Sequence, residues 1–576
     1  MAAPNPLRID TSSEPPIPHI AALFVVKFDH RKGYTLGWHR ATEDVTLEGV
    51  VEYKSLPSGL HSVEEDLVYF IHDEYAGLST FINKPDEQSD RAARMLAVGV
   101  IVPLEHGRMG RSWRHAVVLK ELARSQIEDG DNTTALEEYW DKHKLTPESR
   151  TGSGAQDPQQ TNGYRKSRSM SAATTFISGH HALIPHHPAS TLEESVKTFG
   201  PLIFPLYRAA LLRKRILIVT DTPVEFSCNL VYNMSILSSV STSLLSLIPE
   251  GDVPPYWLRP LFTVGVLDIP QLERNKTPTT TSSSDDSWIA CTTDDVLSTK
   301  PDLYDILVLM PRSDSKTESN RVFPKIVPSK PELTKAFPKT GIKSTQRDYD
   351  RFVHLFQALQ RFAPSPVTNN DFSADGTNDA SSIASGSSGF SENKVVVEPS
   401  SWSRAAYTSL VWWASAGDRR AGLGDSEEDD KERDLALLHY EGDDEQTREV
   451  ALVAYFHSMT KALFQTIAEA VARADGKSLQ EDAYHDDDDD ENDASPADPN
   501  STRQPPVVEG DETENLLGRD GEKGDVEISQ DDMTAMGLDS WSASDKQFVE
   551  NFVHLWWGRK AVVHAGVIEC CGIRII

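Results

Sequence analysis

The stretch Arg215-Ile-Leu-Ile-Val-Thr-Asp221 is the clearest indication of the fold of this chain. It is a short run of branched apolar residues that is bounded by charged residues and followed by Pro223. This pattern is typical of a strand that is buried on both faces. From Val224 to Ile248 the apolar residues recur at helical spacing, until Pro249-Glu250-Gly251 ends the pattern. We therefore predict a buried strand followed by one long helix.

Three further apolar runs follow this helix, and they predict strands at Leu261–Leu267, Trp288–Cys291 and Ile306–Met310. Strands that alternate with a helix on this scale form an α/β layer. Parallel strands cannot be joined by a hairpin, so we expect the helix to serve as the crossover between them. The sequence thus predicts an α/β core module over residues 191–312.

The N-terminal part predicts a meander of strands with one helix packed against it. Residues 1–18 are rich in proline and predict a disordered lead-in. A helix is predicted from Ser112, its N-cap, to Ile127. The predicted strands are Ile20–Phe28, Tyr34–Trp38, Asp66–Ile71, Leu78–Ile82 and Met95–Pro103. A meander followed by a helix is an α+β layout, which we predict for residues 19–150.

Beyond residue 340 the apolar pattern becomes helical, which predicts a helical module over residues 341–475 with disordered insertions such as Asn369–Asn393. Between its last two helices, Arg419–Gln446 is acidic and predicts a loop with one turn at Leu435–Tyr440. The predicted helices are Tyr349–Leu359, Trp402–Ala416 and Thr447–Ala474. Segments rich in Ser, Gly, Pro or Lys predict linkers at 151–190 and 313–340.

A disordered acidic tract is predicted over residues 476–530, because such a composition buries too little apolar surface to offset the entropy of ordering. Order returns at 531–576, where Ser544 and Gln547 form a predicted capping box for an apolar helix. A terminal strand is predicted at Lys560–Glu569. The helix is too apolar to remain exposed, so we expect this segment to dock on the helix at Thr447–Ala474.

Composition excludes several classes of protein. The chain has 576 residues, a formal charge of −31 and a mean hydropathy of −0.42, so it holds several domains and much of it lies outside a core. The charge argues against a chain-wide nucleic-acid surface, which requires a basic face. Four cysteines are too few for a disulfide framework and suit a reducing compartment. We find neither a signal peptide nor a membrane span, and we expect a soluble, cytoplasmic protein.

The motifs of small-molecule chemistry are missing from the sequence. It has no Gly-x-x-x-x-Gly-Lys-Ser/Thr loop, no Gly-x-Gly-x-x-Gly after a strand, no Gly-x-Ser-x-Gly elbow and no His-Glu-x-x-His helix. Gly107-Arg-Met-Gly-Arg111 has two of the glycines of a phosphate loop, but a simple turn is the better interpretation. We therefore assign no catalytic and no cofactor-binding residue, and we expect no cofactor.

A histidine cluster and an aspartate run contain potential metal ligands, but neither has the pattern of a metal site. His180-His181 and His186-His187 lie in a polar segment with flanking prolines and no nearby cysteine, whereas a closed zinc site needs four ligands held by a scaffold. The run Asp486–Asp490 lacks the spaced ligands and the fixed glycine of a calcium loop. We expect a solvated charge run there, and we assign no metal ligand.

Three other groups have both a structural and a functional interpretation. Trp412-Trp413 and Trp556-Trp557 are predicted to be core anchors rather than ligand platforms. Cys570-Cys571 beside an apolar tail is a candidate for S-acylation, but we favour burial in or beside a terminal strand, because free cysteine is among the most buried residue types. Arg213-Lys214-Arg215 predicts a solvated entrance to the strand that follows.

Several blocks of the sequence together carry a family resemblance. The first block is Ile20-Ala-Ala-Leu-Phe-Val-Val-Lys-Phe-Asp-His-Arg-Lys-Gly-Tyr-Thr-Leu-Gly-Trp38. The others are Ser55-Leu-Pro-Ser-Gly-Leu-His61, Asp66-Leu-Val-Tyr-Phe70, Leu212-Arg-Lys-Arg-Ile-Leu-Ile218, Leu245-Ser-Leu-Ile-Pro249, Gly537-Leu-Asp-Ser-Trp541, Trp557-Gly-Arg-Lys-Ala561 and Ile568-Glu-Cys-Cys-Gly572. In this order along the chain the blocks resemble the DENN-domain proteins of the LCHN type, and the C-terminal blocks are similar to the fungal branch of that group.

This resemblance implies a longin-like upstream module, an α/β core DENN module and a helical downstream module. It also implies guanine-nucleotide exchange on a Rab-type small GTPase, with peripheral recruitment to membranes compatible with that role. The alternative is a non-catalytic trafficking scaffold that binds a GTP-loaded GTPase. The GTPase contacts of this family are spread over surfaces rather than held in a compact motif, so the sequence assigns neither partner-binding residues nor an oligomeric state.

Overall fold

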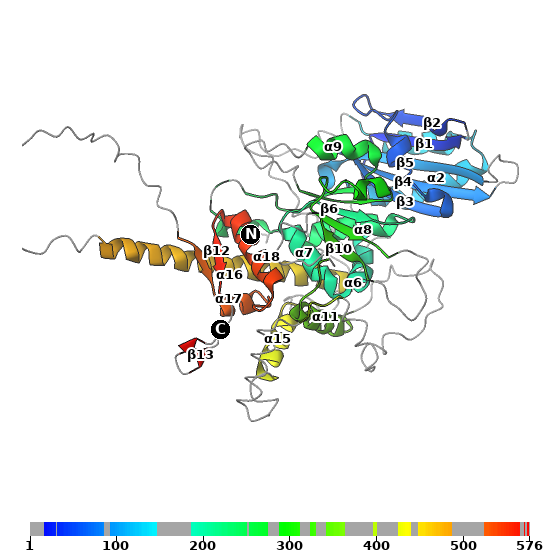
Figure 1. The fold of residues 1–576 in the computed structure, drawn as a ribbon. Helices are drawn as coiled ribbons and strands as arrows, with labels where there is room; N and C mark the ends of the chain where they lie inside the picture. The colour runs from blue at the N-terminus through cyan, green and yellow to red at the C-terminus, as the bar shows by residue number, and fades with distance from the viewer. Residues whose placement is uncertain are drawn as a thin grey trace, which may run out of the picture.

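A single mixed sheet of ten strands runs through the protein (Figure 1). The computed structural model describes residues 17–29, 31–85, 93–146, 186–249, 251, 253–274, 287–311, 323–329, 341–362, 396–399, 424–438, 447–485, 524–564, 569–570 and 573–574. The mixed α/β class predicted from the sequence is confirmed. No helix among these residues is both long enough and apolar enough to span a bilayer.

The N-terminal half of the sheet is antiparallel and has the strand order β3-β4-β5-β1-β2. All five strands predicted there are confirmed, including the hairpin in which Asp29 pairs with Gly33. The strands are β1 (Ala22–Asp29), β2 (Gly33–Ala41), β3 (Glu65–His72), β4 (Tyr75–Pro85) and β5 (Ala93–Pro103).

The second half is parallel, as the apolar runs predicted, and it has the strand order β9-β6-β8-β7. Its strands are β6 (Ile216–Val219), β7 (Arg259–Thr263), β8 (Trp288–Thr292) and β9 (Ile306–Leu309). An antiparallel edge strand, β10 (Lys325–Pro328), pairs with β9 inside the segment predicted as a linker over 313–340, so that prediction is wrong at this point. The two halves join where Phe70 of β3 pairs with Phe262 of β7.

Both faces of the sheet are covered. One continuous core lies under helices α2 (Ala116–Glu128), α7 (Ile203–Leu211) and α8 (Glu225–Leu237). The opposite face carries two smaller cores, one under the segment 45–60 with α1 (Val51–Lys54) and one under α9 (Ile269–Arg274) and α10 (Asp295–Ser298). The remaining helices of this part are α3 (Thr134–His143) and α6 (Leu192–Phe199).

The C-terminal part is mainly helical. Its helices are α11 (Gln346–Leu359), α15 (Gly424–Ala436), α16 (Arg448–His485), α17 (Gln530–Ala535) and α18 (Ala543–Trp557). Two short parallel strands, β11 (Val526–Ile528) and β12 (Ala561–Val563), pair beside α16, and β13 (Glu569–Cys570) pairs with β14 (Ile573–Arg574). The predicted helix Trp402–Ala416 and the insertion Asn369–Asn393 lie outside the described residues.

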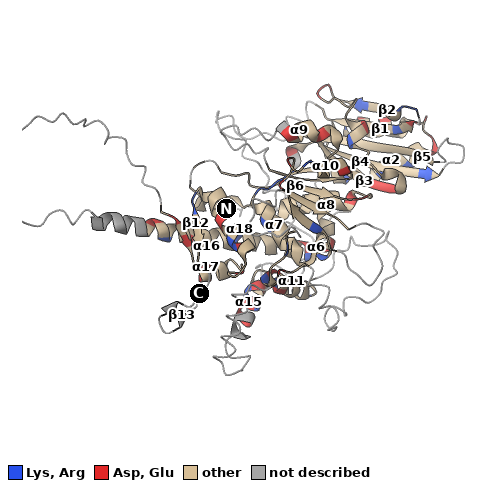
Figure 2. Ribbon diagram, in the orientation of Figure 1, with Lys and Arg blue, Asp and Glu red and all other residues tan. Residues whose placement is uncertain are grey.

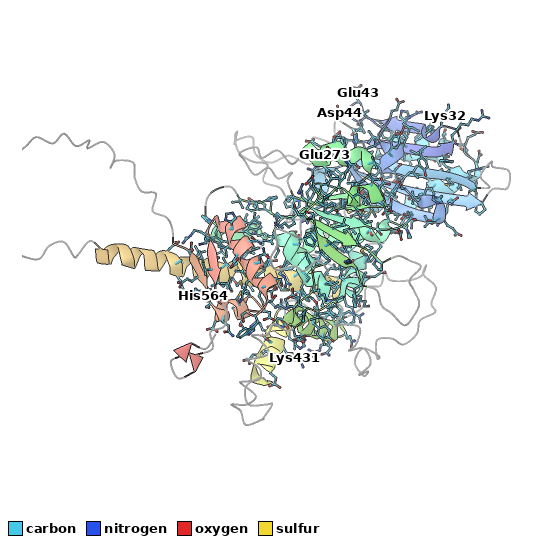
Figure 3. All side chains as sticks on the ribbon, in the orientation of Figure 1. Lys32, Glu43, Asp44, Glu273, Lys431 and His564 are labelled. Atoms are coloured by element: carbon cyan, nitrogen blue, oxygen red, sulfur yellow. The ribbon has the colours of Figure 1, made fainter. Side chains whose placement is uncertain are left out.

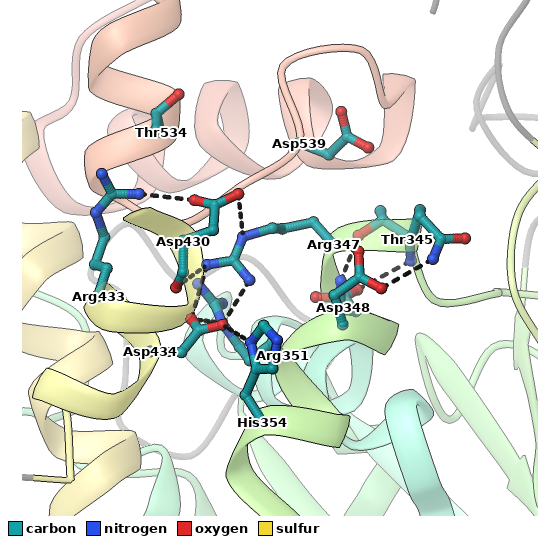
Figure 4. A network of polar contacts seen from close by, with 12 residues as sticks. Thr345, Arg347, Asp348, Arg351, His354, Asp430, Arg433, Asp434, Thr534 and Asp539 are labelled. Atoms are coloured by element: carbon teal, nitrogen blue, oxygen red, sulfur yellow. Dashed lines mark hydrogen bonds and ion pairs between the residues drawn. The ribbon is translucent and has the colours of Figure 1, made fainter. Parts of the chain in front are cut away.

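The segment that appeared too acidic to fold contains a helix, α15, so the loop predicted at Arg419–Gln446 is wrong. Asp434 lies buried at its end and binds two arginines and one histidine of α11 (Figure 4). Arg347 donates two bonds of 2.7 Å to its carboxylate, Arg351 one of 3.2 Å, and His354 lies 3.0 Å away. The exposed face of α15, including Lys431, remains charged (Figure 3). The negative charge of α15 would oppose folding of this segment alone. In the protein, arginines that are distant in the sequence neutralise the buried Asp434.

Three other predicted boundaries are corrected. The predicted tract 476–530 begins too early and ends too late, because α16 continues to His485 and β11 starts at Val526. The helix predicted over Val224–Ile248 ends at Leu237, where the hydroxyls of Ser238 and Ser239 bond back to helix carbonyls. The terminal strand predicted at Lys560–Glu569 is only β12 in the described residues, and it pairs in parallel with β11.

Helix α18 packs against α16 and the core. The ring centroid of Phe464 in α16 lies 5.2 Å from Phe552 and 5.1 Å from Trp556. Trp556 also donates to the carbonyl of Leu211, and Trp557 donates to that of Leu247. The N-cap of α18 is Ser542 with Asp545 at the third position, so the capping box predicted at Ser544 and Gln547 is wrong by two residues.

Replacing Asp434 by Ala should destabilise the protein by about 3–5 kcal/mol, because the buried guanidinium groups of Arg347 and Arg351 would lose their shared carboxylate. Urea unfolding measures this loss. The control is Asp430→Ala, because the Asp430 side chain is 31% exposed and lies 3.6 Å from Arg347. We expect the control to lose less than about 1 kcal/mol, and equal losses in the two variants would contradict the interpretation.

Candidate protein-binding surface

The seam between the two halves of the sheet is crossed by polar contacts as well as by the β3–β7 pair. The Asp66 carboxylate of β3 accepts from the backbone N–H groups of Val224 and Glu225 at 2.7 and 3.1 Å, which caps α8. Lys54 of α1 forms an ion pair of 2.8 Å with Asp268. These contacts hold the loops of both halves at one edge of the sheet, where the parallel strands β6, β7 and β8 end.

Four large apolar side chains are exposed on the elements that meet at this edge. They are Tyr53 of α1 at 58%, Val266 at 48%, Leu267 at 59% and Val296 of α10 at 51%. We call these four residues the seam surface. Large apolar groups that gather at an exposed edge mark interaction sites on soluble proteins.

Asp294 positions two of these residues. Its carboxylate accepts from the backbone N–H of Val266 at 3.3 Å and from the hydroxyl of Ser58, which precedes β3. Val266 and Leu267 stand in a short 3-10 helix (Val266–Asp268) rather than in the strand Leu261–Leu267 predicted from the sequence, because β7 already ends at Thr263. The sequence predicts one strand over the whole apolar run, and no feature of it separates the exposed end from the buried start.

The electrostatics of this edge favour a protein partner over a phosphate. In α/β sheets the N-terminus of a crossover helix commonly binds phosphate, but the carboxylate of Asp66 already occupies the N-terminus of α8. Burial raises the pKa of Asp66 to about 7. Exposed acidic residues also occur on the segments that follow the three parallel strands, at Asp221 after β6, Glu273 in α9 after β7 and Asp295 in α10 after β8. Figure 2 colours the acidic residues red, and Figure 3 labels Glu273. The arrangement fits a partner that combines apolar and basic residues.

The histidine residues weighed as metal ligands are not brought into a cluster in the described part of the chain. His187 is buried, its Nδ1 accepts from the backbone N–H of Ala189, and its ring packs against Trp113 and Tyr232. Burial lowers the pKa of His187 to about 3. No group of three or more His, Cys, Asp or Glu suited to a metal ion occurs among the described residues, and His180, His181 and Asp486–Asp490 lie outside them.

Two arginines bind carbonyl or hydroxyl groups at the ends of helices. Gly107–Arg111 is a turn, as predicted, and it inserts Arg108 at the C-terminus of α8, where Arg108 donates to the hydroxyls of Ser235 and Ser239. Arg213 is only 7% exposed, so its predicted solvation is wrong. It donates to the carbonyls of Ala210, Ser238 and Pro255 and lies over the ring of Trp556. Carbonyls at helix ends attract such cations.

The tryptophan prediction holds for the pair that the structure describes. Trp556 and Trp557 are 2% and 5% exposed and act as core anchors. Trp412 and Trp413 lie outside the described residues, as do the side chains of Cys570 and Cys571, although Cys570 falls in β13. None of the four residues of the seam surface was singled out from the sequence as a site.

The fold defines an α/β protein with one mixed sheet and an exposed apolar edge. A family model described as DENN domain-containing protein 11 matches residues 23–320. Because that match spans more than half of the 576 residues, the chain belongs to this family, and the resemblance stated from the sequence is confirmed. A second model, described as a domain of unknown function, matches residues 397–576.

Relatives in distant organisms share the same region. DENN domain-containing protein 11 of Xenopus laevis is 35% identical over 297 residues, which are 50% of this chain and 59% of that protein. Its namesake in Danio rerio is 34% identical over 292 residues, or 50% of this chain and 53% of that protein. Uncharacterized protein ANR2 of Saccharomyces cerevisiae is 26% identical over 359 residues, or 56% of this chain and 63% of that protein. The chain thus spans between half and two thirds of the length of these relatives.

Replacing Asp294 by Ala should loosen the seam surface, because the backbone N–H of Val266 and the hydroxyl of Ser58 lose their acceptor. We expect a loss of about 1–2 kcal/mol in the free energy of unfolding and faster hydrogen exchange of the amides 265–268. Exposed Asp295 offers the control, since Asp295→Ala should change neither quantity. Unchanged exchange in Asp294→Ala would show that another contact positions Val266.

Proposed function

We propose that this chain is a guanine-nucleotide exchange factor for a Rab-type small GTPase in membrane trafficking. The observation that carries the proposal is the apolar seam surface, at the edge where the two halves of one sheet meet. Membership of a DENN-domain family supports the same assignment.

In this proposal residues 19–150 act as the longin-like upstream module and residues 191–312 act as the core DENN module. The GTPase binds across the two, on the loops that Asp66 and Asp294 tie together. Residues 341–475 form the downstream module. Helix α18 packs on α16 and on the carboxyl end of α7.

Exchange of this kind requires no catalytic group on the factor. A GTPase holds its nucleotide with its own phosphate loop and magnesium ion, and the factor acts by binding the nucleotide-free conformation more tightly than the loaded one. Shifting a population from 1:99 to 99:1 takes about 5.5 kcal/mol of differential binding. A broad apolar surface held on a rigid sheet can supply a difference of that size.

The test is nucleotide release from a panel of Rab GTPases loaded with a fluorescent GDP analogue. Addition of the full chain at micromolar concentration should accelerate release from at least one of them. A chain that accelerates none of them, and that retains only the GTP-loaded form of a partner in a pull-down, would be the non-catalytic scaffold instead.

Within that assay the seam surface should carry the binding energy. We expect the double variant Leu267→Asp/Val296→Asp to lower kcat/KM of exchange by roughly 30-fold or more, because burying two unpaired carboxylates in an apolar interface costs at least about 2 kcal/mol. The matched control is Val117→Asp, since Val117 is 46% exposed on α2. Its exchange rate and the melting temperatures of both variants should stay near those of the unmodified chain. Equal rates in the two variants would place the GTPase elsewhere.

A further inference from the structure

One buried guanidinium is shared by two carboxyl groups that belong to different parts of the chain. Arg208 of α7 donates to both carboxylate oxygens of Asp348 in α11, at 2.8 and 2.6 Å. The same guanidinium lies 3.4 Å from Oδ1 of Asp545 in α18. The side chains are 8%, 1% and 1% exposed, so water does not screen this group. The packing of α18 therefore places a second acid, Asp545, beside the ion pair that Arg208 already forms with Asp348.

The surrounding charges balance without Asp545. In the described part of this network Arg208 faces Asp348, while Arg347 and Arg351 face Asp430 and Asp434. Each arginine thus has a carboxylate before α18 contributes its own. Two carboxyl groups that compete for one buried cation cannot both stay ionised without a large cost.

The hydrogen bonds of Asp545 leave room for a proton. Its Oδ2 accepts from the backbone N–H of Asp539 at 2.8 Å. Its Oδ1 accepts no hydrogen bond from the described residues, although it is fully buried. A protonated carboxyl needs one acceptor site fewer than a carboxylate and carries no charge into this interior.

We propose that docking of the segment 524–564 is coupled to protonation: Asp545 takes up one proton as α18 docks beside Arg208 and Asp348. Docking tightens as the pH falls through neutrality and loosens as the pH rises. The inference is independent of the proposed exchange activity, because it concerns only how one part of the chain packs on another.

The ionisation of the neighbouring groups supports this assignment. Burial raises the pKa of Asp545 to about 7, against the opposing effect of Arg208. Burial also disfavours the charge of Asp348, but the guanidinium of Arg208 outweighs it and holds the pKa of Asp348 below its usual range. The other acidic groups near this site are Asp539 and Glu398, and burial raises the pKa of Glu398. The proton therefore belongs to Asp545 rather than to Asp348.

The sign of the effect follows from linkage. An acid whose pKa is higher in the docked state binds more protons there, so docking weakens as the pH rises from the ordinary aspartate value of 3.8 to about 7. A single proton changes the docking equilibrium by up to about tenfold per pH unit within that window. Above it the dependence on this group ends.

The experiment is hydrogen exchange of the α18 amides in the full chain between pH 5 and pH 8.5, corrected for the intrinsic pH dependence of exchange. We expect protection of α18 in the unmodified chain to fall by up to about tenfold per pH unit up to pH 7. In Asp545→Asn, which keeps an acceptor for Asp539, the slope should vanish. Glu550→Gln removes an exposed acid from the same helix and should keep the unmodified slope.

A second variant covers the case in which Asp545→Asn does not fold. In Asp348→Asn the guanidinium of Arg208 interacts with Asp545 alone, so the pKa of Asp545 should fall. The protection of α18 should then no longer depend on pH above pH 5. A slope in either aspartate variant equal to that of the unmodified chain would overturn the proposal. So would an unmodified chain whose α18 protection does not change with pH.

Discussion

The pairing of β3 with β7 fixes the antiparallel half of the sheet against the parallel half. Phe70 and Phe262, both almost fully buried, make this single antiparallel pair between an antiparallel and a parallel half-sheet. Phe70 lies directly across Gly77, where a Cβ would come within 2.2 Å of its ring, so the neighbouring strand must carry glycine. Because the halves share one sheet and one core, they cannot move independently, and loops separated by more than 150 residues in sequence meet at one edge.

Buried arginines hold the helical part in the way that the sheet holds the strands. Arg208, Arg347 and Arg351 each bind a carboxylate from another helix, across gaps of 140, 87 and 83 residues in sequence. Such pairs add little net stability, because desolvation offsets the Coulombic attraction. Their value is specificity, because a helix that docks in a wrong register leaves a charge buried and unpaired. The few apolar residues of α15 could not define its position alone.

The sequence predicted most of the sheet, because strand periodicity and branched apolar runs are local signals. It failed where the determining partner is distant. Helix α15 was taken for a loop because its acidic residues oppose folding locally, while the arginines that neutralise Asp434 lie on α11. The predicted strand was also wrong at Val266 and Leu267, because an apolar pair at the end of a strand has the same sequence pattern whether it is buried or exposed. The seam surface depends on such exposure, and therefore the sequence did not identify its residues.

The same geometry is compatible with the proposed function, in which the chain promotes nucleotide exchange on a partner GTPase. The site that a nucleotide-binding protein of this architecture would use, at the N-terminus of a crossover helix, is filled by the carboxylate of Asp66. The edge of the sheet is thereby freed from phosphate and offered to a protein. A rigid surface discriminates between two conformations of a partner, because it cannot adapt to both, whereas a flexible surface would bind each of them almost equally well. Discrimination of that kind is what nucleotide exchange requires, and the shared sheet provides the rigidity.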